Sequence, residues 1–335
     1  MPINIVDVAN KAGVCITTVS RVLNNNGQVR ESNRLKVNQA IAELGYNRNA
    51  AARTLVRGKS ETLGIVVPTL NDPFWADLVT QIEHAAFDHG YLVVLALTTD
   101  NNDEVIEKRW IKVFSEGRVD GIFLIAPGYE SDYISELRIR NFPFVLLDNN
   151  QNTLKMPSII VDNTEGGYLA TRHLIELGHK RIGHIAGNLK HQSARERLQG
   201  YYKALNQFDL AVDEHLIGQG NFAVKEAFRI ATEWLSQKQR PTAIFAADDT
   251  MALACLEAAR RLNLEIPRDL SIIGYDDSSI CSVVTPCLST IKQPTSAMAS
   301  EAVQLLLKYL ENKTPRNKTV IISPELIVRE STGPG

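Results

Sequence analysis

The spacing of hydrophobic positions changes near residue 60. Before that point, apolar residues recur every three or four positions, as they do on one face of a helix. This spacing predicts three short helices: one that ends at Gly13, a second that carries Val19 and Val22, and a third over residues 34–44. Three such helices share only a small core, so we expect a small all-α head.

Beyond residue 60, continuous apolar runs alternate with stretches of helical periodicity. The runs read LGIVVP, YLVVLAL, VDGIFLIA, FPFVLLD, SIIVD, RIGHIAG, AIFAADD and LSIIGYDD. Buried runs that are each followed by a helix are typical of a parallel sheet flanked by helices. One sheet with so many strands is unusually wide, so the pattern predicts two consecutive α/β lobes. The helices are expected to begin near Phe74, Glu104, Glu165, Ser193, Val224, Thr250 and Ser296.

Polar side chains directly follow many of these runs. In sheets of this kind, ligands bind at the carboxyl ends of the strands. The side chains that follow the runs are therefore candidate ligand contacts, and many of them are acids or amides. These positions are residues 71–75, 148, 162, 188–197, 248–249 and 276–277.

Charge is distributed unevenly along the 335 residues, although the formal net charge is only −2. Residues 1–60 contain nine Lys and Arg against three Asp and Glu, which leaves about −8 for the remainder. A basic head on an acidic body is typical of a nucleic-acid-binding module attached to another domain. The composition, 44% hydrophobic and 22% charged, is otherwise that of ordinary globular proteins.

No cofactor or metal site is expected. The four cysteines match neither zinc-ligand nor disulfide spacing, which suits a reducing compartment. The N-terminal residues lack a signal-peptide pattern, and no apolar run reaches the roughly 18 residues that span a bilayer. We therefore expect a cytoplasmic protein that does not contact a membrane.

The segment IVDVANKAGVCITTVSRVLN has the pattern of a helix-turn-helix. Its second helix is expected to lie in the major groove of DNA, with Ile16, Thr17 and Arg21 facing base edges. Thr18 and Ser20 are better placed to contact phosphates. Taken alone, the segment is also compatible with a generic helical hairpin, because short motifs of this kind produce false matches.

The whole chain resembles the lactose-repressor and galactose-repressor (LacI/GalR) family of bacterial regulators. The resemblance is carried by VDVANKAGV, TTVSRVLN, AIAELGYNRN, AARTL, LGIVVPTLNDPFWADL, RHLIELGHKRIGHIAG, ADDTMALACLEAARRL, IIGYDDS, LSTIKQP and ELIVRES, in order and at the family's spacing. It implies a helix-turn-helix head joined to a two-lobed α/β domain like that of periplasmic binding proteins, with parallel sheets flanked by helices. A small molecule between the lobes would then set the distance between the heads of a dimer.

The resemblance also implies domain boundaries. The DNA-binding domain is expected at 1–48, a hinge helix and linker at 49–60, and the effector-binding and dimerisation domain at 61–335. Within the last of these, the first lobe comprises about 61–159 plus 292–320, and the second about 160–291 plus 321–335.

By the same resemblance, residues 49–55 form a hinge helix on the operator, with Leu55 inserted into the minor groove. A leucine can partly unstack a base step and kink the DNA. Without the resemblance, the segment is interpreted as an ordinary linker. The resemblance adds three further DNA contacts: Asn24, Asn49 and Ala52.

Three positions depart from the family pattern. Cys15 stands where a capping serine is usual, and a thiol caps a helix poorly. Arg30 replaces a second capping serine, for which Ser32 is the nearest substitute. Arg48 replaces a proline before the hinge, which leaves the stiffness of the hinge open and offers a further phosphate contact.

Effector contacts follow from the resemblance position by position. They fall on Asp72, Phe74, Trp75, Asp148, Asp162, His191, Ser193, Arg197, Phe222, Asp248, Asp276 and Gln293. Aromatic side chains can stack on a ring, carboxylates accept hydrogen bonds from hydroxyls, and Arg197 donates several in a fixed fork. An acid-rich site with few cations favours a neutral sugar or nucleoside over an anionic metabolite. Arg197 and Asp276 are the contacts most expected.

Several of these acids and aromatic residues also have structural explanations. Asp249 is expected to cap the helix that begins at Thr250, and Asp276 with Asp277 can cap the helix that follows them. Trp75 can pack in the core. These alternatives remain open at the level of sequence.

An enzyme is not expected. GQGNFA at 218–223 fits a dinucleotide-binding fingerprint but lacks the acid that should follow about 20 residues later. The predicted function is therefore that of a transcriptional repressor that binds a palindromic operator as a homodimer, because a two-fold site needs a two-fold protein. The alternative is a cytoplasmic solute-binding or ligand-sensing protein without specific DNA binding.

Overall fold

The computed structural model describes residues 3–24, 27–47, 58–98, 104–125, 132–148, 156–311 and 318–335. The chain divides into two compact units, Met1–Glu61 and Thr62–Gly335. The first is an all-α head and the second carries two α/β lobes, so the predicted fold class is confirmed. No helix within these ranges is long and apolar enough to cross a membrane.

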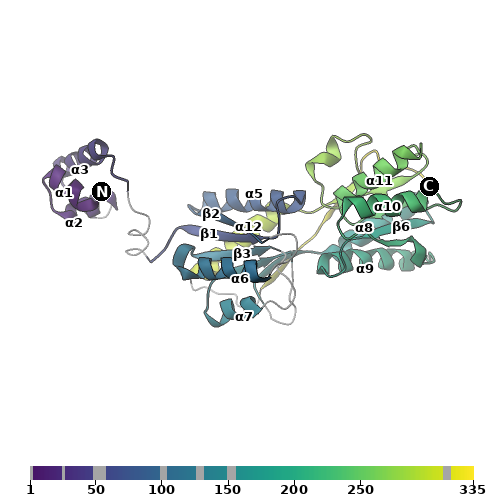
Figure 1. The fold of residues 1–335 in the computed structure, drawn as a ribbon, viewed down its shortest axis with the longest axis horizontal. Helices are drawn as coiled ribbons and strands as arrows, with labels where there is room; N and C mark the ends of the chain where they lie inside the picture. The colour runs from purple at the N-terminus through teal and green to yellow at the C-terminus, as the bar shows by residue number, and fades with distance from the viewer. Residues whose placement is uncertain are drawn as a thin grey trace. The chain divides into compact units, whose positions relative to one another are not determined.

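The head contains three helices, α1 (Ile5–Ala12), α2 (Ile16–Leu23) and α3 (Glu31–Leu44) (Figure 1). α1 begins with a capping box: Asn4 Oδ1 accepts from the amide of Asp7 at 3.4 Å, and Oδ2 of Asp7 accepts from the amide of Asn4 at 2.8 Å. α1 ends at Gly13, whose φ of 65° is a left-handed conformation that glycine adopts without strain.

The start of α3 corrects one expectation. The helix begins at Glu31, before the expected residue 34, and Arg30 at its N-cap makes no side-chain hydrogen bond to it. Ser32 therefore lies inside the first turn and does not cap the helix. An acid in the first turn, here Glu31, stabilises this end through the helix dipole instead.

One valine from each helix forms the centre of the head's core. Val8, Val19 and Val37 are fully buried, and alanines of α1 and α3, Val22 and several partly buried apolar side chains pack around them. An ion pair of 3.0 Å between Lys11 and Glu43 ties α1 to α3 at the surface. The core is small, as the short helices predict.

The first lobe is built on a six-stranded parallel sheet. Its strands, in the order β11-β5-β4-β3-β1-β2, are β11 (Thr319–Ile322), β5 (Ser158–Val161), β4 (Phe144–Leu147), β3 (Gly121–Ile125), β1 (Thr62–Val67) and β2 (Leu92–Leu97). One face is covered by α5 (Pro73–Asp88) and α12 (Thr295–Leu310), the other by α6 (Glu104–Val113), its continuation η1 (Phe114–Arg118) and α7 (Asp132–Ile139) (Figure 1). α7 was not predicted, but parallel β3 and β4 require a crossover between them.

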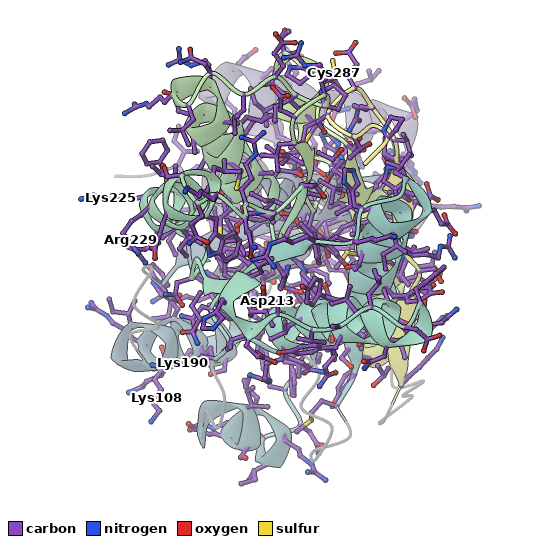
Figure 2. The ribbon with its side chains drawn as sticks, turned by 90° about the vertical axis from the view of Figure 1, so that its right-hand side faces the viewer. Lys108, Lys190, Asp213, Lys225, Arg229 and Cys287 are labelled. Atoms are coloured by element: carbon purple, nitrogen blue, oxygen red, sulfur yellow. The ribbon has the colours of Figure 1, made fainter. Side chains whose placement is uncertain are left out.

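The second lobe has a four-stranded parallel sheet. The order β7-β6-β8-β9 comprises β7 (Ile217–Gln219), β6 (Ile182–Ala186), β8 (Ala243–Ala246) and β9 (Ser271–Ile273). α8 (Asn163–Glu176) and α9 (Gln192–Gln207) pack on one face, α10 (Val224–Leu235) and α11 (Asp249–Arg261) on the other; η2 (Glu214–Leu216) and η3 (Ser279–Ser282) are short turns. Lys225 and Arg229 of α10 point outward from the lobe (Figure 2), whereas Trp234 on the same helix is buried in the core.

Two short strands lie where the chain passes between the lobes: β10 (Thr290–Lys292) pairs antiparallel with β12 (Glu325–Ile327). The expected lobe boundaries differ from the sheets at two points, because 159/160 divides β5 and 320/321 divides β11. Both strands belong entirely to the first sheet. They pair in register from Thr319 with Ser158 to Ile322 with Val161, so each is complete before the chain crosses to the other lobe.

Candidate functional site

The exposed face of α2 is the first candidate site. Val19 and Val22 point into the core of the head, and this orientation leaves Ile16, Thr17 and Arg21 exposed. Ile16 exposes 47% of its surface, so this large apolar side chain is in contact with solvent and is available to a ligand. The residues that were expected to face base edges therefore share the outer face of this helix.

The two ends of α2 are held differently. Cys15 makes no capping hydrogen bond to the helix backbone, as expected, and its Sγ lies 3.1 Å from Oγ1 of Thr18. Hydrogen bonding from Thr18 lowers the pKa of this exposed thiol. At the other end, Asn24 donates to Oγ of Ser20 at 3.3 Å. The expected positions Arg48, Asn49, Ala52 and Leu55 lie outside the described residues.

Arg197 is the centre of the second candidate site, between the two lobes. Its side chain, on α9, is only 3% exposed. Nε donates to Oδ1 of Asn163 at 2.9 Å, and Nη1 donates to the carbonyl of Ala247 at 2.5 Å. The guanidinium lies 3.7 Å from the ring centre of Tyr275, and Nη1 is 3.7 Å from Oδ1 of Asp276. These contacts fix both the plane and the direction of the guanidinium.

Asp276 is held by its backbone and by its side chain. Its amide donates to the carbonyl of Ile291 at 2.7 Å, and Nε2 of Gln293 donates to its Oδ1 at 2.6 Å. Gln293 is buried, and its Oε1 has no hydrogen-bond partner among the described residues. The φ of Asp276 is 112°, a strained conformation of the kind that clusters at ligand sites. An unpaired buried acceptor beside it leaves a position for a donor from a ligand or a water molecule.

Three of the expected effector contacts cap helices. Asp72 accepts from an amide of α5 at 2.9 Å, Asp162 from one of α8 at 2.9 Å, and Asp248 from one of α11 at 2.6 Å. Each carboxylate has a second oxygen or further lone pairs, so capping does not exhaust its capacity to accept. Capping fixes these acids at the carboxyl ends of strands, where the ligand was expected.

The expected cap of α11 is wrong by one residue. Asp248 is the N-cap, while Asp249 is the first residue of the helix and is buried. Asp249 accepts from the hydroxyl of Thr290 at 2.6 Å and from the amide of Ser278 at 2.8 Å. It therefore ties the turn after β9 to the strand that leads back to the first lobe.

The pair Asp276–Asp277 does not cap the next helix either. η3 has Ser278 at its N-cap, and Asp277 forms an ion pair of 2.6 Å with Arg329. Asp277 also has a left-handed backbone, with φ of 60°. Arg329 thus connects the end of the chain to the turn that presents Asp276.

Asp148 and Trp75 meet on the side of the first lobe. Asp148 directly follows β4; burial raises its pKa, and the positive charge of Arg197 and a smaller interaction with Trp75 lower it by less. Trp75 is only half-buried at the start of α5, so it is not purely a core residue. Phe74 differs from it: only 6% of its surface is exposed, and it packs in the core of the first lobe.

The remaining expected contacts gather at the start of α9. His191 precedes the helix, and Ser193 is buried in its first turn. The ring of His191 meets that of Phe222 edge-on, with centroids 6.0 Å apart. Phe222 can approach this closely because residue 187 is glycine: a Cβ there would lie 2.1 Å from the ring.

Burial dominates the electrostatics between the lobes. It raises the pKa of Asp148 and that of Asp248 to about 6, although Arg197 lowers both. Burial also raises the pKa of Asp276 well above its usual range, and that of Asp72 in the same direction. The pKa of Arg197 is lowered by burial but raised more by Asp276 and the other acids, so the guanidinium stays charged.

Sequence reasoning missed Asn163 and Tyr275, whereas Glu196 lies within the range 188–197 that it named. Asn163 follows Asp162 at the end of β5, so the strand-end rule could have included it. Tyr275 was interpreted as the end of a strand, and no local signal marks it as a platform for Arg197. Among the described residues, no group of three or more His, Cys, Asp or Glu side chains is arranged to hold a metal ion.

Comparison with known proteins gives matches to both units of the chain. The family model "Bacterial regulatory proteins, lacI family" matches residues 4–49, and "Periplasmic binding protein-like domain" matches residues 171–332. The chain is 36% identical over 331 residues to the HTH-type transcriptional repressor PurR of Proteus mirabilis (strain HI4320), covering 98% of this chain and 96% of that protein. PurR of Yersinia pestis (strain Pestoides F) is 35% identical with the same coverage.

Solved structures resemble the chain over both units. A lac repressor dimer bound to operator and the anti-inducer ONPF has a TM-score of 0.91 and 30% identity, covering 99% of this chain and 100% of that one. The complex of the transcriptional regulator CelR with cellobiose has a TM-score of 0.75 and 31% identity, covering 98% and 99%. A LacI family regulator from Enterococcus faecium with bound ribose has a TM-score of 0.72 and 26% identity, covering 82% and 99%.

Proposed function

The chain belongs to the lacI family of bacterial regulatory proteins, and we propose how its two sites share the work of a repressor. It is a DNA-binding transcriptional repressor and not an enzyme, with a head that binds DNA and a larger domain that binds a small-molecule effector. The exposed face of α2 reads the operator, and the side chains around Arg197 hold the effector. Since the operator belongs to the bacterial chromosome, the protein acts in the cytoplasm.

The orientation of α2 is the observation that carries the proposal for DNA. With Val19 and Val22 in the core, Ile16 faces outward and can meet a thymine methyl, while Arg21 can bind O6 and N7 of a guanine. Thr17 lies between them on the same exposed face. Thr18, Ser20 and Asn24 contribute to positioning on the phosphates. Asn49, Ala52 and Leu55 complete the DNA contacts through the hinge, as the resemblance implies.

The balance of donors and acceptors supports a neutral effector. Among the described residues, the site offers the carboxyl groups of Asp148, Asp248 and Asp276 and the Oε1 of Gln293, but only one buried cation, Arg197. A sugar or the ribose of a nucleoside supplies many hydroxyl donors, whereas an anion would meet a surplus of acids. The similar structures with cellobiose and with ribose agree with this class of ligand.

The proposal for DNA is tested by gel shifts of the full chain at several salt concentrations, with palindromes from its own promoter region against random DNA. We expect at least about 10³-fold tighter binding to one palindrome, with log affinity falling linearly with log salt. Equal affinity for all sequences would favour the alternative, a ligand-sensing protein without specific DNA binding.

The proposal for the effector is tested by thermal shifts of the full chain with sugars, nucleosides and their phosphate esters. A ligand at 100 times its Kd stabilises a protein by about 2.7 kcal/mol. We expect a neutral compound to stabilise the protein more than its own phosphate ester. A larger shift with the ester would contradict the proposed ligand class.

Exposed apolar side chains support a homodimer. Phe87 at the end of α5 exposes 65% of its surface, and Leu92 and Val94 on the edge strand β2 expose 63% and 43%. Leu92 and Val94 are two positions apart and share a face of the strand. The similar lac repressor structure is a dimer on its operator. Light scattering at micromolar concentration should give a dimer for the wild type and a monomer for the Leu92→Glu, Val94→Glu double variant.

A further inference from the structure

The segment that leads from the second lobe back to the first lies beside the turn that presents Asp276. This crossing segment comprises residues 289–295, which are β10 and its neighbours up to the first residue of α12. The amide of Asp276 donates to the carbonyl of Ile291 at 2.7 Å, and the amide of Gln293 donates to the carbonyl of Asp276 at 3.3 Å. Asp276 thereby pairs with Lys292 as in a parallel ladder. The turn cannot shift along the segment without breaking these hydrogen bonds.

A buried threonine fastens the crossing segment to the second lobe. Thr290 is fully buried, and its hydroxyl donates to Oδ1 of Asp249, the first residue of α11, at 2.6 Å. The same hydroxyl oxygen accepts from the amide of Asp277 at 3.4 Å. The other carboxylate oxygen of Asp249 accepts from the amide and the hydroxyl of Ser278, at 2.8 and 2.9 Å. One carboxylate therefore holds both the crossing segment and the residues that follow Asp276.

The end of the crossing segment is a tight turn. Pro294 has a φ of −80° and a ψ of 72°, the angles of an inverse γ-turn, and the amide of Thr295 donates across it to the carbonyl of Gln293 at 2.9 Å. The proline ring also restricts rotation about φ, which stiffens the turn. The side chain of Gln293 donates to Oδ1 of Asp276 at 2.6 Å. A displacement of Asp276 is therefore passed through a stiff turn to Thr295.

Thr295 connects this turn to α5 of the first lobe. Its hydroxyl donates to Oδ2 of Asp77, in the second turn of α5, at 2.5 Å. Asp77 Oδ1 accepts from Gln81 of the same helix at 3.3 Å. α12, which begins at Thr295, shares the core of the first lobe with α5 (Figure 1). A chain of hydrogen bonds therefore runs from Asp276, an expected effector contact, to the helix that carries Phe87 of the proposed dimer face.

We propose that the crossing segment couples the effector site to α5, and that Thr290 and Thr295 are the positioning residues at its two ends. Neither threonine is an expected contact of the effector or of DNA, so both act through the residues that they hold. Coupling between two sites needs an element whose arrangement both sites affect, and this segment is bonded to an effector contact and to the first lobe. The effect on DNA rests on the proposed function, whereas coupling within the larger domain is measured without DNA or effector.

The first test follows hydrogen exchange of the amides in the first two turns of α5, in the full chain. Thr290→Val keeps the shape of the side chain and removes the hydroxyl, so the crossing segment should be held less tightly. Loss of one hydrogen bond changes an opening equilibrium by roughly 2- to 10-fold, and we expect exchange in α5 to accelerate by such a factor. In a chain that already carries Thr295→Val, adding Thr290→Val should produce no further acceleration in α5.

Two other threonines provide matched controls, because each donates its hydroxyl to a carbonyl of its own helix. Buried Thr171 donates to Gly167, and exposed Thr80 on α5 donates to Ala76, both at 2.9 Å. Thr171→Val removes a buried hydroxyl outside the crossing segment and should leave exchange in α5 unchanged. Thr80→Val removes a hydroxyl from α5 itself, and in that background Thr290→Val should still accelerate exchange.

The serine variants Thr290→Ser and Thr295→Ser retain the hydroxyl and should exchange like the wild type. Equal acceleration by Thr290→Val with and without the Thr295 hydroxyl would overturn the proposal and indicate a route through Asp72, which caps α5. The absence of any acceleration would overturn it as well. If Thr290→Val does not fold, Asp277→Asn takes its place with the same expectations, because it removes the ion pair of 2.6 Å with Arg329 that holds the same turn.

The second test measures operator affinity for Thr290→Val, Thr295→Val and the double variant, without effector. If both threonines act through one segment, the change in affinity of the double variant should differ from the product of the two single changes by at least about twofold. Additive effects, or no effect at all, would overturn the link to DNA. If no palindrome binds more tightly than random DNA, the proposed function fails, while hydrogen exchange in α5 still decides whether the crossing segment couples the effector site to the first lobe.

Discussion

The two proposed recognition sites, on the head and between the lobes, present their side chains in opposite ways. In the head, Ile16, Thr17 and Arg21 lie exposed over a small valine core, whereas Arg197 and Gln293 expose only 3% and 2% of their surfaces. An exposed side chain that only touches its ligand can be exchanged without disturbing the fold. A buried one that is also hydrogen-bonded cannot. DNA preference should therefore change independently of stability, while effector preference should not.

The sharpest test of this difference is Arg197→Ala. Removing the guanidinium leaves the surrounding acids and the carbonyl of Ala247 without their partner, and breaking a buried ion pair costs about 3–5 kcal/mol. We expect the free energy of unfolding in urea to fall by about that amount, together with loss of effector binding. Arg229→Ala, on the exposed face of α10, should change the free energy of unfolding by less than about 0.5 kcal/mol. Equal losses of unfolding free energy in the two variants would show that the buried Arg197 is no more important for stability than an exposed arginine.

Asp148→Asn should raise the free energy of unfolding at high pH, whereas Arg197→Ala lowers it. The pKa of Asp148 is raised from 3.8 to about 6 in the folded protein, so its contribution to stability is present below pH 3.8 and is lost as pH rises through 6. Asparagine carries no such penalty, so above pH 7 the variant should be more stable by up to about 3 kcal/mol. Below pH 4 this advantage should disappear. Urea unfolding at pH 8 and pH 4 measures the difference, and an equal effect at both values would contradict it.

In the head, Arg21→Ala should act on sequence preference alone. Loss of a bidentate contact to guanine costs about 1–3 kcal/mol of discrimination, or roughly 10- to 100-fold in the ratio of specific to non-specific affinity. The melting temperature should stay unchanged, because Arg21 is exposed. Ser20→Ala is the comparison variant and should weaken binding to all sequences alike. A lower melting temperature for Arg21→Ala would show that Arg21 also stabilises the head, contrary to the comparison.

The smallest expected effect is at the start of α2. Cys15→Ser places a hydroxyl where the thiol makes no capping hydrogen bond, which should stabilise the head by about 0.5–1 kcal/mol. Hydrogen exchange of the α2 amides in the full chain measures this directly. Cys287→Ser, which is not at a helix N-terminus, should leave those amides unchanged. Faster exchange in Cys15→Ser would mean that the contact between Cys15 and Thr18 already stabilises the turn.

Most of the fold was predictable because buried strands and amphipathic helices leave long periodic patterns. β7 was missed because its three residues are too few for a period to stand out. α7 was also missed, although with eight residues it is as long as α1 and α2. The expected lobe boundaries cut β5 and β11, because an apolar run does not reveal which of two sheets it joins. Pairing between residues 158–161 and 319–322 depends on tertiary structure.

The site was predictable where a residue follows a strand directly, as Asp148 does, or within three residues, as Asp276 does. The choice between Asp248 and Asp249 as helix cap was not, because it depends on a single residue at a helix start, and pattern reasoning does not resolve helix ends that finely. Tyr275 was missed for another reason: its place beneath Arg197 exists only once α9 and β9 are packed together.

Asp148 and Asp277 have φ angles of 54° and 60°, a left-handed conformation that Asp, Asn and Gly adopt at low cost and that β-branched or bulky residues do not. In the genetic code, aspartate becomes asparagine or glycine by a single base change. The backbone and the code therefore allow the same few substitutions at these positions. A lineage that acquires a new effector can remove or neutralise these carboxyl groups in one step, but it must place new cations or large side chains elsewhere in the site.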